Sequence, residues 1–326
     1  MKGSTEDPVE IFLNQQKATL AAAGVVFDGY FRESSLHASG AVDEGLADLK
    51  RLGHTYEEEG ALWFRTTAFG DDKDRVLVKS DGSRTYFAVD VAYHRDKVRR
   101  GFTRILNIFG ADHHGYLGRL NAAVKALSQN QAELEVIVGQ LVSLTRGGEP
   151  VRMSKRTGDM ITFDDVLEEV GVDATRWYLA AGKASSPLDF DLAVAVQKSN
   201  DNPVFYAQYA HARLCSVERK AAEAGLVAAE RLDGSSLAAP SAVQLAVWLA
   251  RFPDEIAEMA KSREVHHLPR YLTELAAAVH KHYGESRFVD PAAPAATAQH
   301  LLFLKAARSV LALGLGLMGV SAPPQM

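Results

Sequence analysis

The sequence predicts a chain in two parts, an α/β part over residues 1–190 and an all-α bundle over residues 191–326. In the first part, apolar runs at 104–109 and 134–144 flank a stretch with helical spacing at 116–127. Apolar strands joined by a helix are typical of a parallel sheet, whose strand ends carry ligand-binding loops. After about residue 190 the composition changes to alanine-rich segments with helical periodicity, which predicts helices packed on helices.

Composition narrows the class of protein. The 326 residues are 47% hydrophobic and 24% charged, a globular balance that can fill two domains. No apolar run approaches the roughly 18 residues of a membrane span, and the polar N-terminus has no signal-peptide pattern. The net charge of −5 argues against non-specific polyanion binding but not against a local basic site. The single cysteine, Cys215, fits a reducing cytosol and lies in a helical pattern, which indicates a buried thiol.

The elements of the first part follow from spacing and turn residues. Residues 9–23 have helical spacing, and the apolar stretch 25–31 predicts a short strand. Residues 45–67 predict a helix, a turn and a strand. Residues 75–88 resemble a hairpin with Asp81–Gly82 in its turn.

The bundle has its own start and stop signals. Asp201–Pro203 predicts a helix start with proline in the first turn, and residues 268–285 form an amphipathic helix with Pro269 near its beginning. Residues 233–241 and 289–299 are rich in glycine, proline, serine and alanine, so we expect them to connect helices.

A glycine-bounded cationic stretch, GGEPVRMSKRTG, lies at residues 147–158. Lys155 in such a loop could bring a mobile cation to charge that develops on a transferring phosphate, with Ser154 as a hydroxyl donor. Acidic residues after Thr162 predict the first turn of a helix behind the loop. The alternative is a solvated surface turn.

A second polar cluster, GADHHGY, follows the predicted strand at 104–109. Gly110 would let a nucleotide approach the backbone, and Asp112 could accept hydrogen bonds from ribose hydroxyls. The adjacent His113 and His114 also suggest zinc, but consecutive residues rarely chelate one ion. A helix beginning near Gly115 favours a nucleotide phosphate over zinc.

The third candidate is the stretch TYFAVDVAYH at residues 85–94. In an extended segment Tyr86, Ala88 and Asp90 would share a face. An aromatic ring beside a carboxylate suits a cationic, hydrogen-bonding substrate such as a guanidinium. The alternative is a strand end with a solvated aspartate.

Several stretches together resemble the arginyl-tRNA synthetases, which are class I aminoacyl-tRNA synthetases. The loop MSKRTG is similar to that class's second signature, and the other resembling stretches are FGDDKDRVLVKSDGSRTYFAVDVAYHRDK, GADHHGY, DFDL, DNPVFYAQYAHAR and LGLGLMGVSAP. They cover nearly the whole chain in the expected order. The resemblance implies a class I, Rossmann-like nucleotide-binding domain, here incomplete, over residues 1–190 and a helical anticodon-binding domain over 191–326.

The resemblance also implies roles for single residues. The signature loop supplies the groups that stabilise the reacting phosphate: Lys155, Ser154 and Arg152. The ATP-binding positions are Gly110, Asp112, His114 and Met153. The arginine-binding positions are Tyr86 and Asp90, with Asp90 facing the guanidinium. The helix that enters the bundle would contact tRNA through Tyr206, Gln208, Tyr209 and Arg213. The implied partners are arginine, its tRNA and ATP with Mg²⁺. The resemblance implies no tightly bound metal, no organic cofactor and no membrane association. We expect a cytoplasmic protein.

One departure from the family pattern affects the functional prediction. No H-x-G-H, the family's first signature, occurs in the sequence. Losing even one group that stabilises a transition state costs about 10² to 10³ in rate. We therefore expect the carboxyl-terminal part of an arginine–tRNA ligase, inactive without the half that carries this signature; a separate amino-terminal half is one source of it. The alternatives are a non-catalytic relative that binds tRNA or another partner, and an unrelated nucleotide-binding enzyme.

Overall fold

The computed structural model describes residues 7–151 and 161–326, except for the side chains of His113 and His114. The chain divides into two compact units. Residues 27–141 form the first, and residues up to Val26 together with 142–326 form the second.

The unit of residues 27–141 mixes helices with two small sheets. Its elements are α2 (Glu33–Ala38), α3 (Ala41–Arg51), β1 (Thr55–Glu58), β2 (Ala61–Phe64), η1 (Thr66–Phe69), β3 (Arg75–Val78), α4 (Tyr86–Arg99), β4 (Arg104–Gly110), η2 (Ala111–Tyr116), α5 (Leu117–Ser128) and β5 (Glu133–Gly139). Strands β1, β2 and β3 form an antiparallel sheet in that order.

Helices α3, α4 and α5 pack together and enclose the core of this unit. Leu49, Phe64 and Leu77 are fully buried there, and the Phe64 and Phe87 rings stack with centroids 6.1 Å apart. Strands β4 and β5 are parallel, as the sequence predicts, in a register that ends with Gly110 opposite Gly139. The carboxyl ends of both strands therefore meet at a pair of glycines.

Two strand predictions in this region are wrong. Residues 25–31 form no strand; they are a largely exposed connection, with Val26 88% exposed. Residues 86–94, expected to be extended, belong to α4. The Thr85 hydroxyl accepts a hydrogen bond from the Ala88 amide at 3.3 Å and caps this helix, whose apolar face is buried against α3 and α5. The hairpin prediction is correct only for β3 and the turn at Gly82, since α4 begins directly after the return arm.

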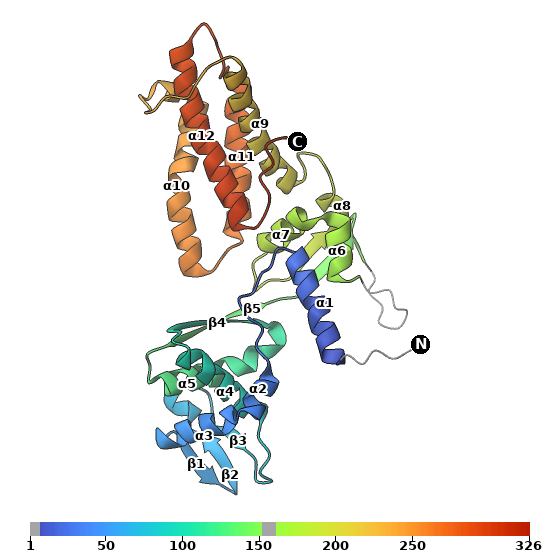
Figure 1. Cartoon of the computed structure of the whole chain (residues 1–326), viewed down its shortest axis with the longest axis vertical. Helices are drawn as coiled ribbons and strands as arrows, with labels where there is room; N and C mark the ends of the chain where they lie inside the picture. Colours follow the sequence, from blue (N-terminus) through green and yellow to red (C-terminus); the bar gives the residue numbers. More distant parts are fainter. Residues whose placement is uncertain (1–6, 152–160) are drawn as a thin grey trace. The chain divides into compact units, whose positions relative to one another are not determined.

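The second unit joins a small α/β layer to a helical bundle (Figure 1). Its elements are α1 (Pro8–Ala22), β6 (Val142–Arg146), β7 (Glu149–Pro150), α6 (Phe163–Val170), α7 (Val172–Ala181), β8 (Leu188–Asp191), α8 (Leu192–Ala195), α9 (Pro203–Glu223), η3 (Ser235–Leu237), α10 (Pro240–Ser262), α11 (His267–Glu285) and α12 (Pro294–Leu317). Strand β6 pairs in parallel with β8 and antiparallel with β7. The apolar run 134–144 thus supplies two strands, β5 and β6, which belong to different sheets.

Helices α9 to α12 lie side by side and share one apolar core (Figure 1). Residues 192–326, all of which the structure describes, contain helices and no strand, as predicted. Helix α12 is long and apolar enough to cross a membrane. This is weak evidence for a membrane span, because buried core helices can have the same length and composition. Here α12 packs against α9, α10 and α11. Cys215 is a buried thiol on α9, also as predicted.

Local capping signals set the helix starts. Asn202 caps α9, with its side-chain oxygen accepting from the Val204 amide at 3.2 Å. Thr162 and Asp165 form a reciprocal capping box at the start of α6. Both helix starts had been predicted from these residues.

Candidate functional site

The residues predicted to act on phosphate fall on a part of the chain that the structure does not describe. Arg152, Met153, Ser154 and Lys155 lie within 152–160, between β7 and α6. Asp191 holds the turn that precedes them. The Asp191 carboxylate accepts hydrogen bonds from the Gly147 and Gly148 amides at 3.1 and 2.8 Å. The Gly148 bond is the main reason that the pKa of Asp191 lies below its usual range.

The predicted nucleotide segment lies at the carboxyl end of β4. A Cβ atom at Gly110 would come within 2.9 Å of the Asp112 carboxylate, so a side chain there would press on Asp112. The 3-10 turn η2 then leads into α5. The His114 side chain lies outside the described residues. The placement of Gly110 at a strand end fits a site where a ligand approaches the backbone, and its role in ATP binding stays a prediction.

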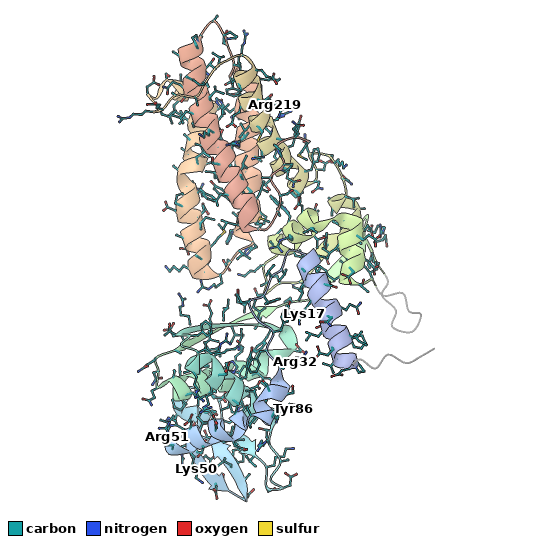
Figure 2. The ribbon with its side chains drawn as sticks, viewed as in Figure 1. Lys17, Arg32, Lys50, Arg51, Tyr86 and Arg219 are labelled. Atoms are coloured by element: carbon teal, nitrogen blue, oxygen red, sulfur yellow. The ribbon has the colours of Figure 1, made fainter. Side chains whose placement is uncertain are left out.

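The predicted arginine-binding pair lies on the first turns of α4. Tyr86 and Asp90 share a helix face because they are four residues apart, not because the segment is extended. The Tyr86 ring is 83% exposed (Figure 2), whereas Asp90 is half-buried. Tyr86 and Asp90 therefore share a face in the observed helix, as they would have in the predicted strand.

Tyr86 lines a cleft of about 650 Å³ between α2, β3, α4 and α5. Its wall contains more basic than acidic side chains: Glu33, His37, Arg75, Lys79, Arg84 and Arg119. Arg84 is paired with Asp43 at 2.5 Å. The Arg119 guanidinium lies 4.5 Å from the centre of the Tyr116 ring, and its Nε is buried without a hydrogen-bond partner in the described residues.

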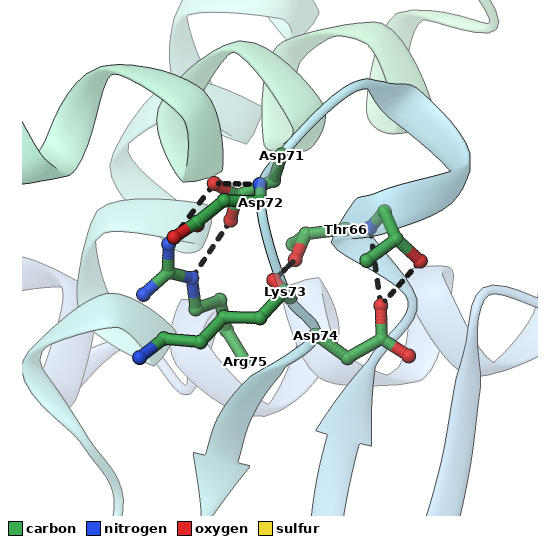
Figure 3. Close-up of polar contacts among 7 residues, drawn as sticks. Thr66, Asp71, Asp72, Lys73, Asp74 and Arg75 are labelled. Atoms are coloured by element: carbon green, nitrogen blue, oxygen red, sulfur yellow. Dashed lines mark hydrogen bonds and ion pairs between the residues drawn. The ribbon is translucent and has the colours of Figure 1, made fainter.

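A polar loop between η1 and β3 holds Arg75 in this wall (Figure 3). The Arg75 guanidinium donates to the Asp71 carboxylate at 2.7 and 3.0 Å and also contacts Asp72. Burial by itself raises the pKa of Asp71, but the hydrogen bonds, chiefly from Arg75, outweigh it and lower the pKa to about 2. A side chain at Gly118 would collide with this carboxylate, so the first turn of α5 lies directly against the loop.

The polar core of this unit contains a hydrogen-bonded chain that sequence analysis missed. Lys97 Nζ lies 2.8 Å from Asn107 Oδ1, Asn107 Nδ2 lies 2.9 Å from His94 Nε2, and His94 Nδ1 lies 2.8 Å from the Asp90 carbonyl. Burial lowers the pKa of His94 to about 4. The spacing of Asp90, His94 and Lys97 would place them on one face of a helix, which could have revealed this chain of hydrogen bonds. The prediction of an extended segment hid that signal.

The four predicted tRNA contacts on α9 occupy different environments. Gln208 is buried, and its amide donates to Asp173 at 2.8 Å and to the Ser321 carbonyl at 3.0 Å. It thereby joins α9 to α7 and to the C-terminal tail. A second cleft, of about 780 Å³, lies beside it and is lined by residues of α7, α9 and this tail.

Tyr206, Tyr209 and Arg213 surround His280 of α11. Arg213 lies 4.4 Å from the Tyr209 ring centre and donates to its hydroxyl at 3.2 Å. Arg213 also donates to His280 Nδ1 at 3.2 Å, so His280 Nε2 carries the proton that the Tyr206 carbonyl accepts. These three residues form one aromatic and cationic cluster, and their contact with tRNA stays a prediction.

One side-chain cluster in the described part of the chain has the atoms to hold a metal ion. It comprises Glu264, His266 and His267 before and at the start of α11. Lys183 lies 2.6 Å from one Glu264 oxygen, and His267 lies 3.2 Å from the other. The carboxylate is therefore already engaged by a cation, so we assign no metal to it.

The sequence model of the family described as tRNA synthetases class I (R), catalytic domain, matches residues 11–198. The chain belongs to the class I arginyl-tRNA synthetases. A second family, the DALR anticodon binding domain, matches residues 207–326. The resemblance and the fold class predicted from the sequence are thus confirmed, while the boundary at residue 190 stays a prediction.

Similar proteins carry the same family name. The arginine–tRNA ligase of Symbiobacterium thermophilum is 49% identical over 97% of the chain and 57% of its own length. That of Frankia alni is 47% identical over 99% of the chain and 59% of its own length. The solved Thermus thermophilus arginyl-tRNA synthetase aligns with a TM-score of 0.81 at 24% identity, over 98% of the chain and 63% of that structure, a likeness in fold. The chain spans a little over half the length of these curated relatives.

Proposed function

We propose that these residues serve an arginine–tRNA ligase. The observation that carries the proposal is the pair of family matches, a class I (R) catalytic domain followed by a DALR anticodon-binding domain. The identity of 49% to a curated arginine–tRNA ligase supports it. The lone buried cysteine suits a reducing compartment, and we place the activity in the cytoplasm.

The reaction would run in two steps. An oxygen of the arginine carboxylate attacks the α-phosphorus of Mg²⁺-bound ATP, the bond to pyrophosphate breaks, and arginyl-adenylate forms. A ribose hydroxyl at the end of the tRNA then attacks the arginyl carbonyl carbon, and AMP leaves. The negative charge that builds up on phosphate in the first step needs fixed or delivered cations. We assign that task to Lys155 with Arg152 and Ser154.

The remaining assignments place each substrate on a different element. ATP would lie at the carboxyl end of β4 against Gly110 and Asp112, with His114 and Met153 as further contacts. Arginine would lie on α4, with its guanidinium facing Asp90 and the Tyr86 ring beside it, a pairing of a cation with a carboxylate and an aromatic face. The tRNA would approach the bundle at α9, near Tyr206, Tyr209, Arg213 and the buried Gln208.

Arginine-dependent ATP–pyrophosphate exchange tests the proposal. The purified chain is assayed with and without tRNA, and again with an amino-terminal half that carries an H-x-G-H motif. Exchange in either sample supports an arginine–tRNA ligase, and in the second it also supports a separate amino-terminal partner. No exchange in any sample, combined with retained tRNA binding, would replace the proposal with a non-catalytic tRNA-binding protein.

Lys155→Ala tests the assigned phosphate contact in whichever sample is active. We expect kcat to fall by about 10² to 10³ with little change in the KM for arginine, because the lysine would act mainly on the transition state. Lys50→Ala is the matched control, since Lys50 is an exposed lysine paired with Glu57 on the surface. An equal effect of Lys155→Ala on kcat and KM would remove Lys155 from this role.

A further inference from the structure

Three polar side chains in the unit of residues 27–141 are buried or half-buried although none of them belongs to the predicted site. His94 is 2% exposed, Asn107 is 7% exposed, and Lys97 is half-buried. They connect α4 to β4, the two elements that carry the predicted arginine-binding and ATP-binding residues. Buried polar groups are costly unless every one is paired, so their arrangement requires an explanation.

The chemistry of Lys97 determines the direction of every bond in the chain. A lysine ammonium can only donate, so the Asn107 atom at 2.8 Å from it must be the carbonyl oxygen. The Asn107 amide nitrogen then faces His94 and donates to Nε2 at 2.9 Å. Nε2 is therefore an acceptor, and the ring proton lies on Nδ1, which donates to the Asp90 carbonyl at 2.8 Å.

This direction cannot be reversed by rotating a side chain. Turning the Asn107 amide over would point its NH₂ group at the Lys97 ammonium, and protonating His94 on Nε2 would point two donors at each other. The positive charge of Lys97 also disfavours a positive charge on the His94 ring. The chain therefore has one hydrogen-bonded arrangement, and it ends on the backbone of the residue predicted to bind arginine.

We propose that Lys97, Asn107 and His94 are positioning residues that hold the turn of α4 carrying Asp90 in register with β4. The inference rests on the proposed function for its ligand, arginine. These hydrogen bonds link the arginine-binding helix α4 to strand β4, which ends in Gly110, so that a displacement of one element shifts the other. Asp90 itself would touch the substrate, and the three other residues act through it.

Other charged groups near α4 do not compete for the His94 ring. On α3, Glu44 and Asp48 are hydrogen-bonded to Arg95, at 2.8 and 2.6 Å, on another face of α4. None of the charged side chains on the elements packed against α4 is hydrogen-bonded to His94 among the described residues: Glu33, His37, Asp43, Glu44, Asp48, Lys50, Arg51, Arg75, Arg119 and Lys125. Lys97 is the charged side chain that reaches the ring, through the Asn107 amide.

Nitrogen-15 NMR of the histidine rings in the full chain tests the direction of the hydrogen bonds. At pH 6.5 we expect the His94 ring to be neutral with its proton on Nδ1. In Asn107→Asp, the new carboxylate can accept from both Lys97 and His94, so we expect a doubly protonated ring at pH 6.5, which requires a His94 pKa raised by about 3 units or more. A neutral ring with its proton on Nε2 in the wild type, or an unchanged ring in Asn107→Asp, would refute the proposed direction of the hydrogen bonds.

Calorimetric titration with arginine tests the positioning. Asn107→Leu removes both bonds and leaves Lys97 Nζ and His94 Nε2 without the Asn107 amide as a partner, so we expect the Kd for arginine to rise about tenfold and the amides near Asp90 to exchange faster. Ser128→Ala is the matched control, because it removes another buried hydrogen bond of this unit, from the Ala132 amide at 3.1 Å. Equal arginine affinity in Asn107→Leu and Ser128→Ala would overturn the positioning role.

Two outcomes separate this inference from the proposed function. If Asn107→Leu does not fold, Asn107→Asp carries the arginine titration. Its carboxylate keeps both bonds, so its Kd for arginine should stay within about twofold of the wild-type value, and a rise of about tenfold would overturn the positioning role. If the wild-type chain binds no arginine, either alone or with the amino-terminal half added, the arginine site of the proposed function is overturned. The His94 ring signals and the amide exchange near Asp90 still decide whether the hydrogen bonds among Lys97, Asn107 and His94 hold this turn of α4.

Discussion

Asp71→Asn should destabilise the unit of residues 27–141 by about 2–3 kcal/mol at pH 7. The Asp71 side chain is 4% exposed and the Arg75 side chain 12% exposed, so water does little to screen their ion pair. One pKa unit corresponds to about 1.4 kcal/mol. The fall in the Asp71 pKa from 3.8 to about 2 thus corresponds to about 2.5 kcal/mol. Leaving the Arg75 charge with only its contact to Asp72 adds to the loss.

The pH dependence gives a second test with a definite sign. The pKa of Asp71 is depressed in the folded state, so its contribution to stability is fully present above pH 4. It is lost as the pH falls from 3.8 toward about 2, where the wild-type carboxylate becomes protonated. The difference between the wild type and Asp71→Asn should therefore narrow over that range.

Urea unfolding measures both effects. The full chain is equilibrated in urea at pH 7 or pH 3, and a hydrogen-exchange pulse at fixed pH is read by mass spectrometry on peptides from residues 61–78. Asp72→Asn is the control, since Asp72 also contacts Arg75 but its side chain is 73% exposed. Equal midpoints for wild type and Asp71→Asn at pH 7, or a difference that does not change with pH, would refute the argument.

Two further predictions concern the bundle and are measured by thermal melts of the full chain. Gly314→Ala would place a Cβ 2.5 Å from the fully buried Leu272 side chain and should cost about 1–3 kcal/mol, whereas Gly316→Ala in the same helix meets nothing within 4 Å and should be neutral or stabilising. Equal melting temperatures for the two variants would contradict this packing. Asn202→Ala removes three hydrogen bonds to backbone atoms and should cost about 2 kcal/mol, while a change at the exposed Asp201 should cost little. A loss as large at Asp201 would show that the cap is not what matters.

Much of the candidate site follows from local signals. The strand ending at Gly110, the helix after it and the parallel partner strand come from apolar runs bounded by glycine. The stretch that contains Lys155 lies between glycines and the capping box at Thr162, and both signals are visible in the sequence. The family resemblance rests on the order of these motifs, and residues 11–198 match the catalytic family as that order predicts.

The part that failed was the segment 86–94. Tyrosine, phenylalanine and valine favour strands, and the alternation of polar and apolar residues there suggested two faces. The Thr85 cap and the burial of Phe87, Val91 and Ala92 against α3 and α5 decide for a helix. Tertiary burial outweighs a weak local preference, because apolar contacts with two helices stabilise more than β propensity does.

The sequence by itself determined the division into α/β and helical parts, most helix starts and the family, because these depend on periodicity, caps and motif order within short stretches. Only the tertiary structure decided which polar residues act together. Asp71 with Arg75, Gln208 with Asp173 and Ser321, and the chain from Lys97 to Asp90 are pairings of buried groups. Such pairings depend on the distances that packing creates, and no local pattern encodes those distances.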